Sequence, residues 1–250
     1  PPRSTPKPSS AASDVYKRQN TLTAPSETFK TISENYDFKQ AVIPISLLML
    51  FAVLSSAILS EQIADLQWEQ IEQSINNNPN ISEEQKQQIL GSQYDRIYSN
   101  TGPGSIFIYI SSAISWPMRL LFWSLFSMII GNLALGSKIQ FGKIFIVNSF
   151  AYLPSVVEYI IKTPIQYVSD NMMIFTGLGA LGVGEQGSFV NNFLSGIDIF
   201  ALWRVYLTSV AFTFLYQKNI TETSKAMGFL WIASLLIFSA IGAFFAGLGG

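Results

Sequence analysis

The sequence predicts an all-α fold: a polytopic membrane helix bundle with five transmembrane helices and a small outer helical insertion. The first observation is that five stretches are apolar and long enough to cross a bilayer, which takes about 20 residues of helix. The second is that a long polar segment, 61–104, separates the first two stretches. Composition limits the function instead: the 250-residue chain contains no Cys and no His, which excludes thiol nucleophiles, imidazole bases and the usual zinc or haem ligands.

The first 19 residues resemble a translated sequencing-library adapter. Residues 9–19 read SSAASDVYKRQ, the translation of a transposase-type adapter, and PPRST at the start matches a flow-cell primer. A natural, disordered tail rich in Pro and Ser is the alternative. We exclude 1–19 from fold reasoning as an artefact and interpret 20–40 as a cytoplasmic N-terminal segment and 41–250 as the membrane domain.

The five spans are expected at the following positions: 41–60, 113–136, 144–161, 197–216 and 226–247. The apolar stretch from Ser105 to Leu135 is longer than one span needs, and Pro117 divides it. We expect 105–114 to be an interfacial segment; one long, tilted span is the alternative.

Basic residues predict the orientation, because Lys and Arg favour cytoplasmic loops. One set of flanks holds six lysines, whereas the other holds three basic residues in far longer loops. The six are Lys30, Lys39, Lys138, Lys143, Lys218 and Lys225, and the three are Lys86, Arg96 and Lys162. The bias predicts a multi-pass protein with the N-terminus in the cytoplasm and the C-terminus outside.

The outer insertion, 61–104, is expected to form two short helices that cap the spans. The run from Asn76 to Asn80 contains Pro79 and breaks the helical pattern. Ser82 then offers an N-cap, and Gln85 completes a capping box.

Four ionisable residues fall within the spans, where charges are costly and indicate function by default. They are Arg119, Glu158, Asp198 and Arg204, and the predicted orientation puts them all in the outer half of the bilayer. The functional interpretation is a polar site for an ion, a lipid headgroup or a proton. The structural one, which we favour, is an ion-pair network that joins Glu158 to Arg119 or Arg204.

Asn132 and Asn148 flank the inner loop on facing helices, where asparagines make interhelical hydrogen bonds more often than they bind ligands. The glycines of residues 176–188 match the spacing of a dinucleotide fingerprint, but no strand precedes them. That stretch is better interpreted as a flexible or re-entrant connection. No cofactor and no metal site are expected.

The second half resembles a known family. The order of segments is FAYLP at 150–154, then a glycine-rich connection, then DIFALWR at 198–204 and a final span. This order is similar to the Yip-one domain family of Ypt/Rab-interacting, five-span membrane proteins, and in particular to its bacterial-type members. The resemblance implies a helical, non-catalytic membrane protein, and the likeness to bacterial-type members implies a bacterial cytoplasmic membrane. The eukaryotic relatives bind prenylated Rab GTPases and act in vesicle transport. This chain lacks their DLYGP motif before the first span, which argues against binding of small GTPases.

The function expected is that of a non-enzymatic scaffold or organiser in membrane trafficking or assembly, with protein partners or a homo-oligomer in the lipid bilayer. The alternative is a transporter or permease subunit that uses the outer charge cluster. A membrane enzyme would depend on carboxylates alone and is the least favoured class. Without residues 1–19 the chain has 11 basic and 15 acidic residues, a net charge of −4, so no nucleic-acid partner is expected.

Overall fold

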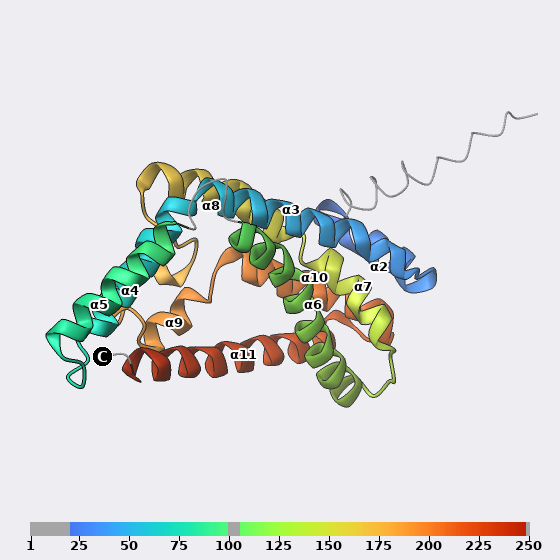
Figure 1. Cartoon of the computed structure of the whole chain (residues 1–250). Helices are drawn as coiled ribbons and strands as arrows, with labels where there is room; N and C mark the ends of the chain where they lie inside the picture. Colours follow the sequence, from blue (N-terminus) through green and yellow to red (C-terminus); the bar gives the residue numbers. More distant parts are fainter. Residues whose placement is uncertain (1–20, 100–105, 249–250) are drawn as a thin grey trace, which may run out of the picture. The chain divides into compact units, whose positions relative to one another are not determined.

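The computed structural model describes residues 21–99 and 106–248, and these residues are almost entirely helical (Figure 1). The predicted adapter, 1–19, lies outside the described residues. The helices are α2 (Pro25–Glu34), η1 (Phe38–Ala41), α3 (Val42–Ile58), α4 (Ser60–Asn76), α5 (Glu83–Tyr98), α6 (Ile106–Leu135), α7 (Phe141–Ala151), α8 (Pro154–Ser169), η2 (Leu178–Leu181), α9 (Phe189–Ser195), α10 (Ile199–Tyr216) and α11 (Ile220–Leu248).

Five helical segments of the described chain are long and apolar enough to cross a membrane, which confirms the predicted fold class. They are Phe38–Ile58, Ile106–Leu135, Phe141–Ser169, Ile199–Tyr216 and Ile220–Gly247. The last begins six residues before the predicted start, because Asn219 accepts a hydrogen bond from the backbone N–H of Glu222 and so begins α11 earlier.

The predicted division of the second span at Pro117 is wrong. Helix α6 runs without interruption from Ile106 to Leu135 with Pro117 inside it. Proline removes one backbone donor, but spanning helices tolerate this because neighbouring groups compensate for the lost bond. The alternative of one long span therefore describes this segment better than a separate interfacial helix does.

The third span is longer than predicted and is broken. Helix α7 ends at Ala151, Tyr152 and Leu153 form a turn, and Pro154 begins α8, which continues to Ser169. Proline suits the first turn of a helix, because the backbone N–H that it lacks has no partner there. The predicted end at residue 161 was too early, because Lys162 was counted as part of a loop.

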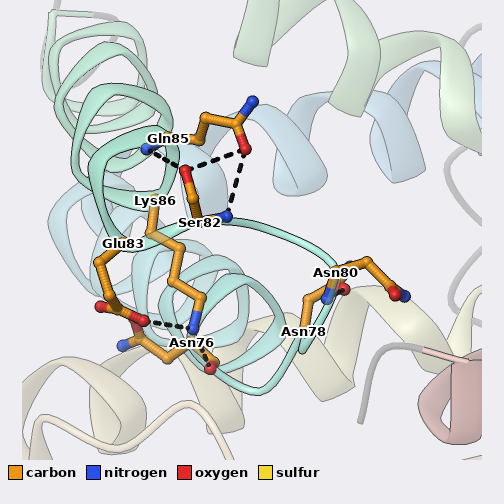
Figure 2. Close-up of polar contacts among 7 residues, drawn as sticks. All are labelled: Asn76, Asn78, Asn80, Ser82, Glu83, Gln85 and Lys86. Atoms are coloured by element: carbon orange, nitrogen blue, oxygen red, sulfur yellow. Dashed lines mark hydrogen bonds and ion pairs between the residues drawn. The ribbon is translucent and has the colours of Figure 1, made fainter.

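The polar insertion forms the two predicted helices. Helices α4 and α5 pack against each other, with the Trp68 ring edge-on to Tyr94 and the Tyr98 hydroxyl donating to Asp65 at 2.6 Å. Figure 2 shows the turn between them, where Ser82 and Gln85 form the predicted capping box. Lys86 closes the turn by donating to the Asn76 carbonyl oxygen at 3.0 Å.

The chain divides into two compact units, and each of the five spans contributes residues to both. Within the described residues, unit 1 comprises 21–47, 119–154 and 204–230. Unit 2 comprises 48–99, 106–118, 155–203 and 231–248. The two units differ sharply in charge. The described part of unit 1 holds eight basic and four acidic residues, a net charge of +4, whereas unit 2 holds three basic and eleven acidic residues, a net charge of −8.

Unit 1 includes a helix that the sequence analysis did not anticipate. Helix α2 begins at Pro25 and buries Phe29 and Ile32 on one face. It packs against α7, as η1 does, and the Phe38 ring stacks on Phe145 with ring centroids 5.6 Å apart. Residues 21–40 are therefore a folded part of unit 1 and not only a leader to the first span.

Candidate functional site

Unit 2 contains an ion triad of Lys162, Glu158 and Asp198. Lys162 and Glu158 lie in the span Phe141–Ser169, whereas Asp198, predicted inside the fourth span, precedes its first residue, Ile199. The Lys162 Nζ lies 2.6 Å from Glu158 Oε1 and 3.1 Å from Asp198 Oδ2. The three side chains are only 16, 21 and 13% exposed in that order. Solvent screening is therefore weak, and these charges interact more strongly than a surface pair does.

The local sequence explains how two carboxylates reach one lysine. Glu158 and Lys162 are four residues apart on α8, a spacing that places them on one helix face. Asp198 stands just before α10, where its Oδ1 accepts from the Ala201 backbone N–H at 2.7 Å. Its other oxygen, Oδ2, meets Lys162, so one carboxylate both caps α10 and joins it to α8.

The glycine stretch positions Asp198. Gly177 forms an isolated antiparallel bridge with Asp198, and the Leu178 N–H donates to the Ile197 carbonyl oxygen at 3.0 Å. A Cβ at Gly177 would collide with the Ile197 carbonyl oxygen and the Asp198 Cα. The stretch is therefore a closely packed backbone support for the triad, with η2 inside it, and it does not form a dinucleotide loop.

A second polar centre lies in unit 1, around Tyr152 at the break between α7 and α8. The Arg204 guanidinium lies 5.9 Å from the centre of the Tyr152 ring, and Arg119 is close enough to act electrostatically on the same tyrosine. The Trp123 ring meets Tyr152 edge-on with centroids 6.1 Å apart. Arginine over an aromatic face is a cation–π contact, which gains strength away from water.

The structure thus distributes the four predicted charges between two centres. Glu158 and Asp198 contact Lys162 in unit 2. Arg204 lies over Tyr152 in unit 1, and Arg119 is near enough to act electrostatically on the same tyrosine. The predicted pairing of Glu158 with either arginine stays a prediction. Sequence reasoning missed Lys162 and Tyr152, although the Glu158–Lys162 spacing was a visible signal for the first.

The two asparagines lie in unit 1 and contact neighbouring polar groups. Asn148 is fully buried, and its amide donates to Ser124 Oγ and Ser127 Oγ, each at 3.0 Å. Asn132 Oδ1 accepts from the Ile139 backbone N–H at 2.9 Å and from the Tyr216 hydroxyl at 2.8 Å. Both asparagines therefore join elements of the bundle that are far apart in sequence.

The comparison with protein families decides the family. A model of the Yip1 domain matches residues 20–247. The chain belongs to the Yip1 domain family. No curated protein and no solved structure gave a significant match.

Both polar centres lie inside the matched range, as do all five spans. The chain is therefore a multi-pass integral membrane protein of the Yip1 family, a family associated with membrane trafficking and not known for enzymatic activity. No three His, Cys, Asp or Glu side chains in residues 21–99 and 106–248 lie together in a way that could hold a metal ion.

Proposed function

We propose that this Yip1-family protein is a non-enzymatic membrane scaffold that organises other membrane proteins. The family match over residues 20–247 is the observation that carries the proposal. The two polar centres support it, because each joins segments of the bundle through charge or cation–π contacts. Neither contains Cys or His, so neither has the nucleophile and base of common hydrolases. No observation specifically favours the transport alternative.

Helix α11 offers the surface that such a scaffold needs. Only 11% of its most apolar window is buried within the chain, against 67% for the span of α7 and α8. Phe229, Phe238 and Phe245 are among its most exposed side chains. This helix is available to lipid and to other membrane proteins, whereas α7 buries every residue from Ile144 to Ala151.

We further propose that unit 1 faces the cytoplasm. Its net charge of +4 against −8 for unit 2 follows the positive-inside rule. The N-terminus then lies in the cytoplasm, and the α4–α5 hairpin forms the outer insertion. An odd number of spans puts the C-terminus outside.

Site-specific photocrosslinking in native membranes tests the scaffold proposal. A photoreactive phenylalanine analogue replaces Phe238, which is 69% exposed, and in a control variant replaces Phe212, which is fully buried. We expect the Phe238 position to crosslink to a defined membrane protein in stoichiometric yield, and the Phe212 position to crosslink only within the chain. Crosslinks from Phe238 to lipid alone, or to a nucleotide-hydrolysing transport subunit, would contradict the scaffold role.

A further inference from the structure

Five lysines of unit 1 stand at the ends of spans, in three connections that are far apart in sequence. Lys39 lies in η1, ahead of α3. Lys138 lies in the loop after α6, and Lys143 lies in the first turn of α7. Lys218 lies between α10 and α11, and Lys225 lies in the second turn of α11. We call these five residues the lysine surface.

Asn132 holds two of the three connections together. Its Oδ1 accepts from the Ile139 backbone N–H, in the loop that carries Lys138, and also from the Tyr216 hydroxyl. Tyr216 is the last residue of α10 and stands two positions before Lys218. The loop after α6 and the end of α10 therefore meet at one side chain.

Tyr36 joins the third connection to the same end of unit 1. Its hydroxyl donates to Gln140 Oε1 at 3.4 Å, next to Ile139 in the loop after α6. Its ring lies 4.8 Å from the Lys143 Nζ. Because Phe38 also stacks on Phe145, η1 and its Lys39 are fixed against the start of α7.

The lysine surface presents positive charge outward. Four of its members are exposed, and Lys143 is half-buried against Tyr36. The described part of unit 1 has four acidic residues, Glu27, Glu34, Asp37 and Glu222. Glu222 lies 3.9 Å from Lys218, with both side chains at least 40% exposed, and Asp37 accepts from the Lys39 backbone N–H. An exposed pair at such a distance neutralises little of the charge.

The position of these lysines relative to the apolar spans indicates their partner. Each lies within a few residues of a span end, at the depth where a spanning helix leaves the hydrocarbon. Flexible ammonium groups at that depth contact lipid headgroups. Each lysine strengthens binding to anionic headgroups by about fivefold. We propose that the lysine surface binds anionic lipid headgroups, a role that depends on the five spans but not on the scaffold function.

Lipid retention by the purified full chain tests this. The delipidated protein is mixed with equimolar phosphatidylglycerol and phosphatidylcholine in detergent and desalted, and both lipids retained are measured by mass spectrometry. The test variant is Lys138→Gln/Lys225→Gln, because both side chains are exposed. One control keeps the charges as Lys138→Arg/Lys225→Arg. A second, Lys86→Gln/Arg96→Gln, removes two positive charges from unit 2 instead.

We expect the unaltered chain to retain phosphatidylglycerol over phosphatidylcholine by about fivefold or more, and high salt to reduce the preference. In the Lys138→Gln/Lys225→Gln variant the preference should fall at least severalfold, while both controls keep it. Equal retention of the two lipids by the unaltered chain overturns the proposal. So does an undiminished preference in the test variant, or an equal loss in either control.

Discussion

At the residue scale, Lys162 is expected to contribute strongly to stability, because it is the cation that two carboxylates share. Replacing it in Lys162→Met leaves Glu158 and Asp198 facing each other in a poorly solvated place. We expect a loss of about 1–3 kcal/mol in the free energy of unfolding, since the groups are largely but not fully buried. Thermal unfolding in detergent measures it.

The matched variants make that prediction specific. Asp198→Asn should cost less than Lys162→Met, because an Asn still caps α10 and Glu158 still pairs with Lys162. Lys162→Arg keeps the charge and should cost least. If Lys162→Met unfolds at the same temperature as the unaltered chain, the triad does not stabilise the bundle.

Gly131 is the second residue with a sharp expectation. A Cβ at this position would lie 2.5 Å from the Tyr216 hydroxyl oxygen and 2.9 Å from the Phe212 ring, so Gly131→Ala should displace Tyr216 from Asn132. We expect a loss of about 1–3 kcal/mol, as for other overpacked sites. Gly228→Ala is the control in the same unit, since nothing lies within 4 Å of its Cβ. Unfolding experiments that rank the two variants equally would contradict this account of Gly131.

Individual residues also show what could not be predicted from the sequence. The four predicted charges were visible in the sequence, but their partners depend on which helices meet, and that is a property of the fold. Lys162 was missed because the third span was ended at residue 161. Tyr152 was missed because a tyrosine in an apolar run gives no signal until an arginine is seen to approach it.

At the element scale, the α4–α5 hairpin gives a prediction about pH. The hydrogen bond to Asp65 raises the pKa of Tyr98 from 10.0 to about 12. Because the folded-state pKa is the higher one, the stabilisation is complete below pH 10 and is lost as the pH rises through about 12. We expect Asp65→Asn to return the tyrosinate titration of Tyr98 towards 10, measured as the absorbance difference from a Tyr98→Phe chain. A titration that Asp65→Asn leaves unchanged would contradict this contact.

The elements also differ in how well the sequence predicted them. The capping box at Ser82 was predictable because capping is a local pattern of a few residues. The continuity of α6 through Pro117 was not, because whether a proline breaks a spanning helix depends on what surrounds it. The break at Tyr152 and Leu153 similarly divides a span that the hydropathy pattern presents as one.

At the scale of the whole molecule, the separation of charge between the units is the feature that relates fold to membrane. Basic residues gather in unit 1 and acidic residues in unit 2, although every span contributes to both. The six-to-three lysine and arginine bias was readable from the sequence. What the structure adds is that Asn132 and Tyr36 bring the lysine-bearing connections together at one end of unit 1.

The central claim is a five-span protein whose basic unit faces the cytoplasm, and labelling of single cysteines in intact cells tests it most directly. The chain has no cysteine of its own, so Asn80→Cys, between α4 and α5, and Ser137→Cys, between α6 and α7, each provide one reactive thiol. We expect a membrane-impermeant maleimide to label Asn80→Cys in intact cells, and Ser137→Cys only after permeabilisation. Labelling of Ser137→Cys in intact cells, with or without labelling of Asn80→Cys, would contradict the account.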